Sequence, residues 1–146
     1  MIRLLSDQIP QYWGIINYGA LAAYSLLAGK ETRRRDFSVN LLINLMTGRA
    51  QCWFVVENET KAIKVVIITK IVSGIADTKH LLVDAVYGYA PTTNDEKYNF
   101  YEDLMAFARN THCESVTMIT TNNMAMNAAA KAGFIQTHKV YTARVQ

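Results

Sequence analysis

Cysteine and histidine side chains can hold metal ions or act as nucleophiles. Cys52 and Cys113 lie far apart in the sequence, and neither belongs to a CxxC pair. His80, His112 and His138 are scattered without the short spacing that metal ligands need. Cys113 follows His112 directly, but adjacent side chains usually point apart, and no third group is placed to orient a thiolate–imidazole pair. The sequence therefore predicts no metal site, no disulfide scaffold and no cysteine nucleophile.

A single carboxylate, that of Asp84, lies inside the apolar run HLLVDAVYGY. A carboxylate among apolar neighbours can accept a proton, which would make Asp84 a general base. The other interpretation is structural: a partner at the edge of a sheet satisfies the carboxylate, as buried charges require. The sequence leaves both interpretations open.

Positive charge is concentrated in one stretch that contains Lys30, Arg33, Arg34 and Arg35. These side chains could contact phosphate groups, or they could form a solvated connection between two helices, and the role of the Arg33–Arg35 cluster stays open. No aromatic stacking platform accompanies them. Charged residues make up 18% of the chain and the net charge is +3, so no nucleic-acid partner is expected.

The segment from Gln8 to Gly29 carries no charged residue and is about as long as a membrane-spanning helix. Pro10 and several polar residues interrupt it, and its apolar positions recur at helical spacing, among them Trp13 and Ile16. This pattern predicts a buried helix and no membrane association. The first residues also lack the positive region and the cleavage site of a signal peptide, so we expect a reduced, cytoplasmic protein that is not secreted.

The elements that would position these residues follow from the periodicity of apolar side chains. With 146 residues, 51% of them hydrophobic, the chain is expected to form one domain over residues 1–146. The predicted order is strand Met1–Leu5, helix Ser6–Gly29, helix Asp36–Gly48, strands Cys52–Glu57, Ala62–Val72 and His80–Tyr89, helix Asn94–Asn110, strand Ser115–Thr120, helix Asn122–Gly133 and strand Phe134–Val145. This order predicts an α/β protein with a mixed sheet.

Two motifs in the second half of the chain resemble the GCN5-related N-acetyltransferase (GNAT) superfamily. Asn122-Asn123-Met124-Ala125 and Lys131-Ala132-Gly133-Phe134 are similar to the family's last helix, which has an Asn, an Ala three positions on and Gly-Phe at its end. Tyr89-Ala90-Pro91 is similar to the end of the family's central strand. The resemblance spans nearly the whole chain. It implies a GNAT-like fold, with a mixed, mostly antiparallel central sheet flanked by helices.

The resemblance also implies where acetyl-CoA would bind. Family members present backbone amides at the start of the next helix to the pyrophosphate of the cofactor. Asn94, Lys97 and Asn99 stand where the family has Arg or Gln, then Gly, then Gly or Ala. Together with Tyr89 and Asn122, these residues would be the cofactor-binding set.

Two features of this region oppose the cofactor. The chain has no glycine between Gly88 and Gly133, so each backbone amide of the implied site carries a neighbouring Cβ. Asp95 and Glu96 occupy the first turn of the predicted helix, where carboxylates interact favourably with the helix dipole and repel a phosphate. We therefore expect the chain's own side chains to fill the site, and no cofactor.

The catalytic residues of the family are only partly matched. The family commonly places a Tyr seven positions after the motif Asn, as the acid that protonates the leaving thiolate, and this chain has Ala129 there. If the chain is active, Asp84 would accept a proton from the acceptor amine. The acid would have to be another tyrosine, and Tyr87, Tyr89 and Tyr98 are candidates by residue type, with Tyr98 the one we select.

Aromatic residues crowd the region where the family separates two strands to admit the cofactor. They are Tyr87, Tyr89, Tyr98, Phe100 and Tyr101. These rings could fill the vacated cleft, or they could form part of a protein interface, where tyrosine is frequent. Ordinary packing in the core is the alternative, above all for Tyr87 and Phe100.

These departures favour a degenerate, non-catalytic member of the superfamily that acts as a structural or interaction protein. Such a pseudoenzyme resembles the acetyltransferase-like virion and assembly proteins of tailed phages. The expected partners are other proteins or further copies of the chain, either in the cytoplasm or in a phage particle. The alternative is an acetyl-CoA-dependent N-acetyltransferase that acts on an amine.

Overall fold

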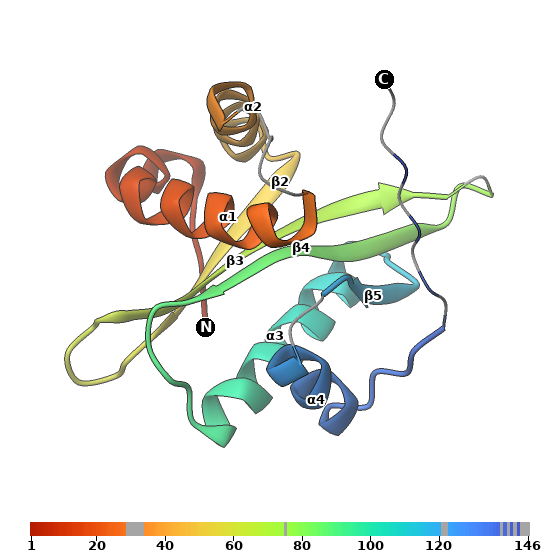
Figure 1. Cartoon of the computed structure of the whole chain (residues 1–146). Coiled ribbons are helices and arrows are strands. Elements are labelled where there is room, and N and C mark those ends of the chain that lie inside the picture. The colour runs from red at the N-terminus through yellow and green to blue at the C-terminus, as the bar shows by residue number, and fades with distance from the viewer. Residues whose placement is uncertain are drawn as a thin grey trace.

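The computed structural model describes residues 1–28, 34–74, 76–120 and 123–137, together with residues 139, 141 and 143. A five-stranded sheet forms the centre of this part of the chain (Figure 1). The elements are β1 (Ile2–Arg3), two short 3-10 helices (Ser6–Gln8 and Pro10–Tyr12), α1 (Trp13–Ala28), α2 (Arg34–Met46), β2 (Ala50–Val56), β3 (Ile63–Ser73), β4 (Lys79–Gly88), α3 (Asn94–Asn110), β5 (Ser115–Met118) and α4 (Asn123–Lys131).

The strands follow one another in the sheet in the order of the sequence, from β1 to β5. The first four are antiparallel neighbours, and β5 alone pairs in parallel, with Ser115–Met118 beside His80–Val83. A parallel pair needs a long crossover, and α3 supplies it. The predicted fold class, an α/β protein with a mixed and mostly antiparallel sheet, is confirmed.

Helices cover both faces of the sheet, with α1 and α2 on one side and α3 and α4 on the other (Figure 1). Side chains alternate between these faces along β3. Val66 and Ile68 belong to the core beneath α1 and α2, whereas Val65 and Ile67 belong to the core beneath α3. The apolar runs of the central strands are explained by this burial on both faces.

The predicted first helix begins later than expected. Two 3-10 turns precede α1, which starts at Trp13, and the predicted end at Gly29 lies outside the described residues. No helix among the described residues has both the length and the apolar character needed to cross a bilayer. The second helix begins before the predicted Asp36, so that Arg34 and Arg35 are helical and not part of a connection, while Arg33 lies outside the described residues.

The predicted final strand over Phe134–Val145 is wrong for the described residues of that segment, which form no strand. Gly133 adopts a φ of 92°, as a left-handed end of the preceding helix requires. The amide of Phe134 donates to the carbonyl of Ala129, and its ring packs on Tyr101. Ile135 is 80% exposed, so the chain here follows the surface and is not buried in a sheet.

Candidate functional site

The central strand β4 is irregular at Asp84. Ile68 of β3 pairs with Ala85, and the next residue, Thr69, pairs with Val83, so Asp84 is the extra residue of a β-bulge. The bulge changes which face the side chains reach: Val83 packs in the core beneath α3, whereas Ala85 packs in the core beneath α1 and α2. It therefore turns a polar residue of an otherwise apolar strand toward α1.

Asp84 accepts a hydrogen bond from the Tyr24 hydroxyl, with 2.9 Å between Tyr24 Oη and Asp84 Oδ2. Burial, the hydrogen bond to Asp84 and the charge of Asp84 together raise the pKa of Tyr24 to about 12, and burial has the largest effect. Asp84 thus has a structural partner, although not at a sheet edge, because β4 lies between β3 and β5. Its role as a proton acceptor stays a prediction.

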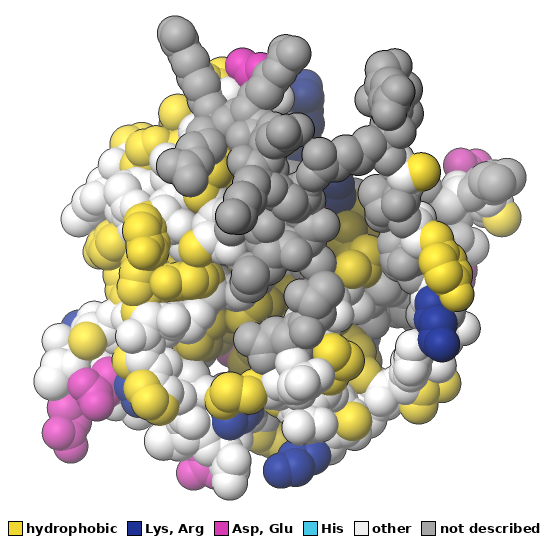
Figure 2. Space-filling view, in the orientation of Figure 1, with side chains coloured by type: hydrophobic (Ala, Val, Ile, Leu, Met, Phe, Trp, Pro, Cys, Tyr) yellow, Lys and Arg dark blue, Asp and Glu magenta, His cyan; other side chains and the backbone are white. Residues whose placement is uncertain are grey.

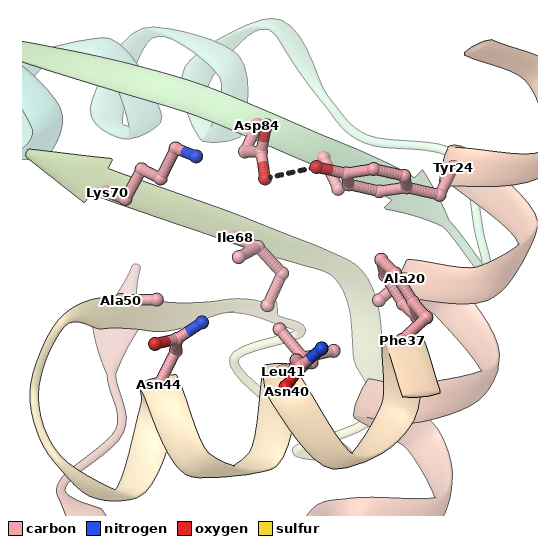
Figure 3. A pocket seen from close by; sticks show the side chains of 11 residues that line it. Ala20, Tyr24, Phe37, Asn40, Leu41, Asn44, Ala50, Ile68, Lys70 and Asp84 are labelled. Carbon is pink, nitrogen blue, oxygen red and sulfur yellow. Dashed lines mark hydrogen bonds between the residues drawn. The ribbon is translucent and has the colours of Figure 1, made fainter. Parts of the chain in front are cut away.

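A cavity of about 180 Å³ lies between the sheet and the helices α1 and α2, and Asp84 lines it (Figure 3). Tyr24 comes from α1, Asn40 and Asn44 come from α2, and Lys70 comes from β3. The cavity therefore combines a carboxylate, an ammonium group, a phenol and two amides from four elements. The rest of its wall is apolar apart from the backbone, and is formed by Ala20, Phe37, Leu41, Ala50, Ile68 and Ala85.

The start of α3 is capped by the chain itself. Thr93 is the N-cap residue, and its hydroxyl accepts a hydrogen bond from the Glu96 amide at 3.1 Å. The Glu96 carboxylate accepts one in return from the Thr93 amide at 3.2 Å. This reciprocal pair is a capping box, which the sequence Thr-x-x-Glu signals.

Glu96 is also paired with Lys64 of β3, with 2.8 Å between Lys64 Nζ and Glu96 Oε1. The hydrogen bond from Lys64 is the main reason that the pKa of Glu96 lies below its ordinary value. The anion at this helix N-terminus is thus a side chain of the protein. The residues present do not fit the pyrophosphate of acetyl-CoA at this place, because Glu96 already holds the amide and the cation that would bind it.

The structure does not gather the other predicted site residues around Asp84. Tyr98 is 65% exposed on α3, whose buried residues face the opposite side of the sheet, and it does not line the cavity. Asn94 and Asn99 are exposed on α3 and Lys97 is half-buried there, while Asn122 lies outside the described residues.

The predicted aromatic group is divided between the two faces. Phe100 and Tyr101 belong to α3 and are buried in the core between α3 and the sheet. Tyr87 and Tyr89 instead pack against each other and against Tyr18 of α1, with ring centroids between 4.9 and 6.2 Å apart. The bulge explains the position of Tyr87 and Tyr89, because it sets the direction of the side chains that follow it, whereas Phe100 and Tyr101 belong to α3.

Gly19 allows Tyr87 of β4 and Tyr89, which follows this strand, to approach α1 closely. A Cβ at this position would lie 3.3 Å from Tyr87 Cβ and 3.4 Å from the Tyr89 hydroxyl. That hydroxyl donates to the carbonyl of Ile15 at 2.7 Å, which joins the end of β4 to α1. Tyr18 remains 61% exposed, and hydrophobic side chains gather on the surface over α1 (Figure 2). We call Tyr18, Tyr87 and Tyr89 the tyrosine cluster.

The chain resembles known proteins in its structure. No protein-family model matches the chain, and no curated protein sequence does. Among solved structures, a predicted acetyltransferase from Clostridium acetobutylicum, determined with acetyl-CoA, matches with a TM-score of 0.72 and 10% identity over 98% of this chain and 94% of its own. A GNAT family acetyltransferase from Staphylococcus aureus matches with a TM-score of 0.65 and 11% identity over 99% and 96%.

The chain has the GNAT acetyltransferase fold. An aminoglycoside 6'-N-acetyltransferase from Acinetobacter baumannii shares it, with a TM-score of 0.65 and 12% identity over 99% of this chain and 96% of its own. These matches extend over both chains almost completely, which confirms the GNAT-like architecture predicted from the two motifs. At such low identity the likeness concerns the fold, and function has to be argued from this chain's own residues.

Sequence reasoning identified Asp84 and Glu96 but missed several of their neighbours. Lys70 was detectable, because it interrupts the apolar strand IKVVIITKIVS as Asp84 interrupts the next one. Lys64 interrupts the same strand near its start, whereas Tyr24 gave no such signal. Their roles depend on the packing of α1 on the sheet and of α3 beside β3, which only the fold reveals.

Proposed function

We propose that this chain is a GNAT-fold protein that performs no acyl transfer and instead acts as a structural or interaction protein. The observation that carries the proposal is the self-capped start of α3. A pyrophosphate bound there would have to displace Glu96 from the Thr93 amide and from Lys64, and would then lie beside the displaced carboxylate and Asp95. Like charges at a helix N-terminus disfavour this exchange.

The tyrosine cluster supports an interaction role. Tyrosine is enriched in protein interfaces because its large ring contributes apolar contact while its hydroxyl still forms hydrogen bonds. Tyr18 and Tyr89 expose much of their rings, and their positions are fixed by contacts with Tyr87 and by the bond from Tyr89 to Ile15. A rigid, exposed aromatic surface loses little side-chain entropy when a partner covers it.

The kind of assembly we propose is that of a tailed-phage virion or assembly protein, following the resemblance of the sequence to that group. Native mass spectrometry of the purified chain, alone and after co-purification from infected cells, tests this assignment. We expect self-association or recovery within a larger particle. A strictly monomeric chain that carries bound CoA would contradict it.

Binding of acetyl-CoA is the direct test of the lost cofactor site. A ligand at a hundred times its dissociation constant stabilises a protein by roughly 2.7 kcal/mol, which thermal unfolding detects readily. We expect no change in the melting temperature of the wild-type chain at millimolar acetyl-CoA. A clear increase would overturn the proposal.

Two double variants test why the cofactor is excluded. Replacing Asp95 and Glu96 by glycine removes both carboxylates and frees the Thr93 amide, so we expect measurable CoA affinity. The matched variant with Asp95→Asn and Glu96→Gln removes the charge but keeps a side chain that can cap the helix, so we expect weaker affinity or none. If the glycine variant binds no CoA while remaining folded by circular dichroism, Glu96 is not what excludes the cofactor.

The alternative function is an acetyl-CoA-dependent N-acetyltransferase. The cavity beside α1 and α2 favours it, because Asp84 lies in this cavity at the bulge of β4, where it could receive a proton from an amine. The acetyl-CoA measurement on the wild-type chain decides between the two functions.

A further inference from the structure

The cavity beneath α1 and α2 contains two opposite charges that do not neutralise each other. Lys70 pairs with Leu82 across the β3–β4 ladder, and Asp84 lies two positions beyond Leu82, so the two charged side chains are diagonal neighbours on the sheet. Both line the cavity, where the Lys70 side chain extends toward Asp84 and the Asp84 carboxylate faces Tyr24 (Figure 3). Among the described residues, Tyr24 donates to Asp84, and no carboxylate forms an ion pair with Lys70.

The side of the cavity formed by α2 adds two further polar groups. Asn40 and Asn44 are one helical turn apart and therefore lie on the same side of the helix. No hydrogen bond to another described residue occupies either amide. Each amide can donate and accept, so the pair can bind either end of a polar ligand.

The remaining wall is apolar and the space is small. Phe37, Leu41 and Ile68 line the cavity on the helix and sheet sides. An apolar cavity of about 150 Å³ in another protein holds a benzene molecule. The volume of about 180 Å³ here therefore suits a ligand of similar or slightly larger size.

We propose that this cavity binds a free α-amino acid with an aliphatic side chain. Asp84 would hold the ammonium group, Lys70 the carboxylate, and the apolar wall the side chain. A ligand with one charge would leave either Lys70 or Asp84 without a counter-charge in a partly desolvated site, and an uncharged ligand would leave both. Only a zwitterion gives both Lys70 and Asp84 a counter-charge. The proposal involves no acetyl-CoA and holds whether or not the chain is an enzyme.

Three matched ligands test the recognition of both charges. L-leucine carries both groups, 3-methylbutylamine lacks the carboxylate, and 4-methylpentanoate lacks the ammonium group. In titration calorimetry at pH 7 without acetyl-CoA, we expect leucine to bind at least about tenfold more tightly than either analogue, because each charge-assisted hydrogen bond adds this much. Glycine should bind more weakly than leucine, since it leaves the apolar wall uncovered.

Single variants then assign each charge to its residue. We expect Lys70→Met to reduce the affinity for leucine about tenfold and to leave that for 3-methylbutylamine unchanged or higher. We expect Asp84→Asn to reduce the affinity for leucine about tenfold and to leave that for 4-methylpentanoate unchanged or higher. Lys131→Met, which removes an exposed lysine of α4 on the other face of the sheet, should change none of the affinities.

Three results would overturn the proposal. The first is no saturable binding of leucine up to millimolar concentration. The second is leucine binding no tighter than its one-charge analogues, which would mean that Lys70 and Asp84 pair with each other. The third is an equal loss of affinity for all three ligands in the Lys70→Met and Asp84→Asn variants, measured on protein that remains folded by circular dichroism. This would mean that both residues affect only the shape of the cavity.

Discussion

The partly buried Tyr24, which donates a hydrogen bond to Asp84, links the stability of this protein to pH. The pKa of Tyr24 is about 12 in the folded chain, chiefly through burial, compared with an ordinary value of 10.0. The stabilisation that corresponds to this difference is fully present below pH 10 and is lost as the pH rises toward 12, where the folded protein also ionises.

We therefore expect Tyr24→Phe to lose less stability than the wild-type chain between pH 9 and about pH 11.5, because phenylalanine has no proton to release. Urea unfolding at a series of pH values measures this slope. Tyr98→Phe, which changes an exposed tyrosine, is the control and should retain the wild-type slope. Equal slopes for Tyr24→Phe and the wild type would show that Tyr24 ionises normally.

The two cysteines should differ strongly in reactivity. Cys52 is fully buried in β2, and burial raises the pKa of its thiol to about 12, so almost no thiolate forms at neutral pH. Cys113 is partly exposed. We expect iodoacetamide at pH 8 to modify the folded chain once, at Cys113, and twice in denaturant, as measured by mass spectrometry.

A Cys113→Ser variant serves as the control for this experiment and should remain unmodified while folded. Rapid modification of Cys52 in the native chain would mean that β2 opens to solvent.

At the residue level, the sequence predicted site residues where a charged side chain interrupts an apolar segment. Asp84 is conspicuous because it interrupts an apolar strand, and its two suggested roles came from that contrast. Its hydrogen-bond partner was not predictable, because Tyr24 is one of several aromatic residues on an apolar helix. The bulge that selects Tyr24 is a property of the register between β3 and β4.

At the level of elements, a capping box defines the start of α3. Thr93 satisfies one free amide of the first turn, and Glu96 satisfies another. We expect Thr93→Ala to lower the free energy of unfolding by about 1 kcal/mol, the usual effect of losing an N-cap hydroxyl.

Thr92→Ala provides a matched control for this cap, because Thr92 is the preceding threonine and lies outside the capping box. Its unfolding free energy should stay within about 0.5 kcal/mol of the wild type. Equal effects of the two substitutions in urea unfolding would contradict the assigned cap.

The central strands were predicted well and the last one was not, for a physical reason. Ala62–Val72 and His80–Tyr89 are apolar almost throughout, as strands covered on both faces must be, and β3 and β4 lie close to these bounds. The segment after Gly133 also contains β-branched and aromatic residues. Strand propensity depends on available neighbours, and Ile135 is exposed, without a sheet to pack on.

For the whole molecule, the sheet divides the core into two separate parts. Ile16 is fully buried beneath α1, and Leu104 is fully buried beneath α3 on the other face. Because the two side chains belong to different clusters, their contributions to stability should be independent.

We expect Ile16→Val to cost about 0.5–1.5 kcal/mol and Leu104→Ala about 2–5 kcal/mol in urea unfolding. The double variant should equal the sum to within about 0.5 kcal/mol, with a single transition. A deviation of more than about 1 kcal/mol would indicate that the sheet transmits changes in packing from one face to the other.

The capped start of α3 also gives the molecule a built-in competitor. Glu96 is tethered one helical turn from the amide that it occupies, so its effective concentration there is on the order of millimolar or higher. An anion free in solution at micromolar concentration would have to prefer this position by about a thousandfold to displace it. A single substitution that shortens this side chain would therefore remove the competitor and leave the Thr93 amide accessible to an anion from solution.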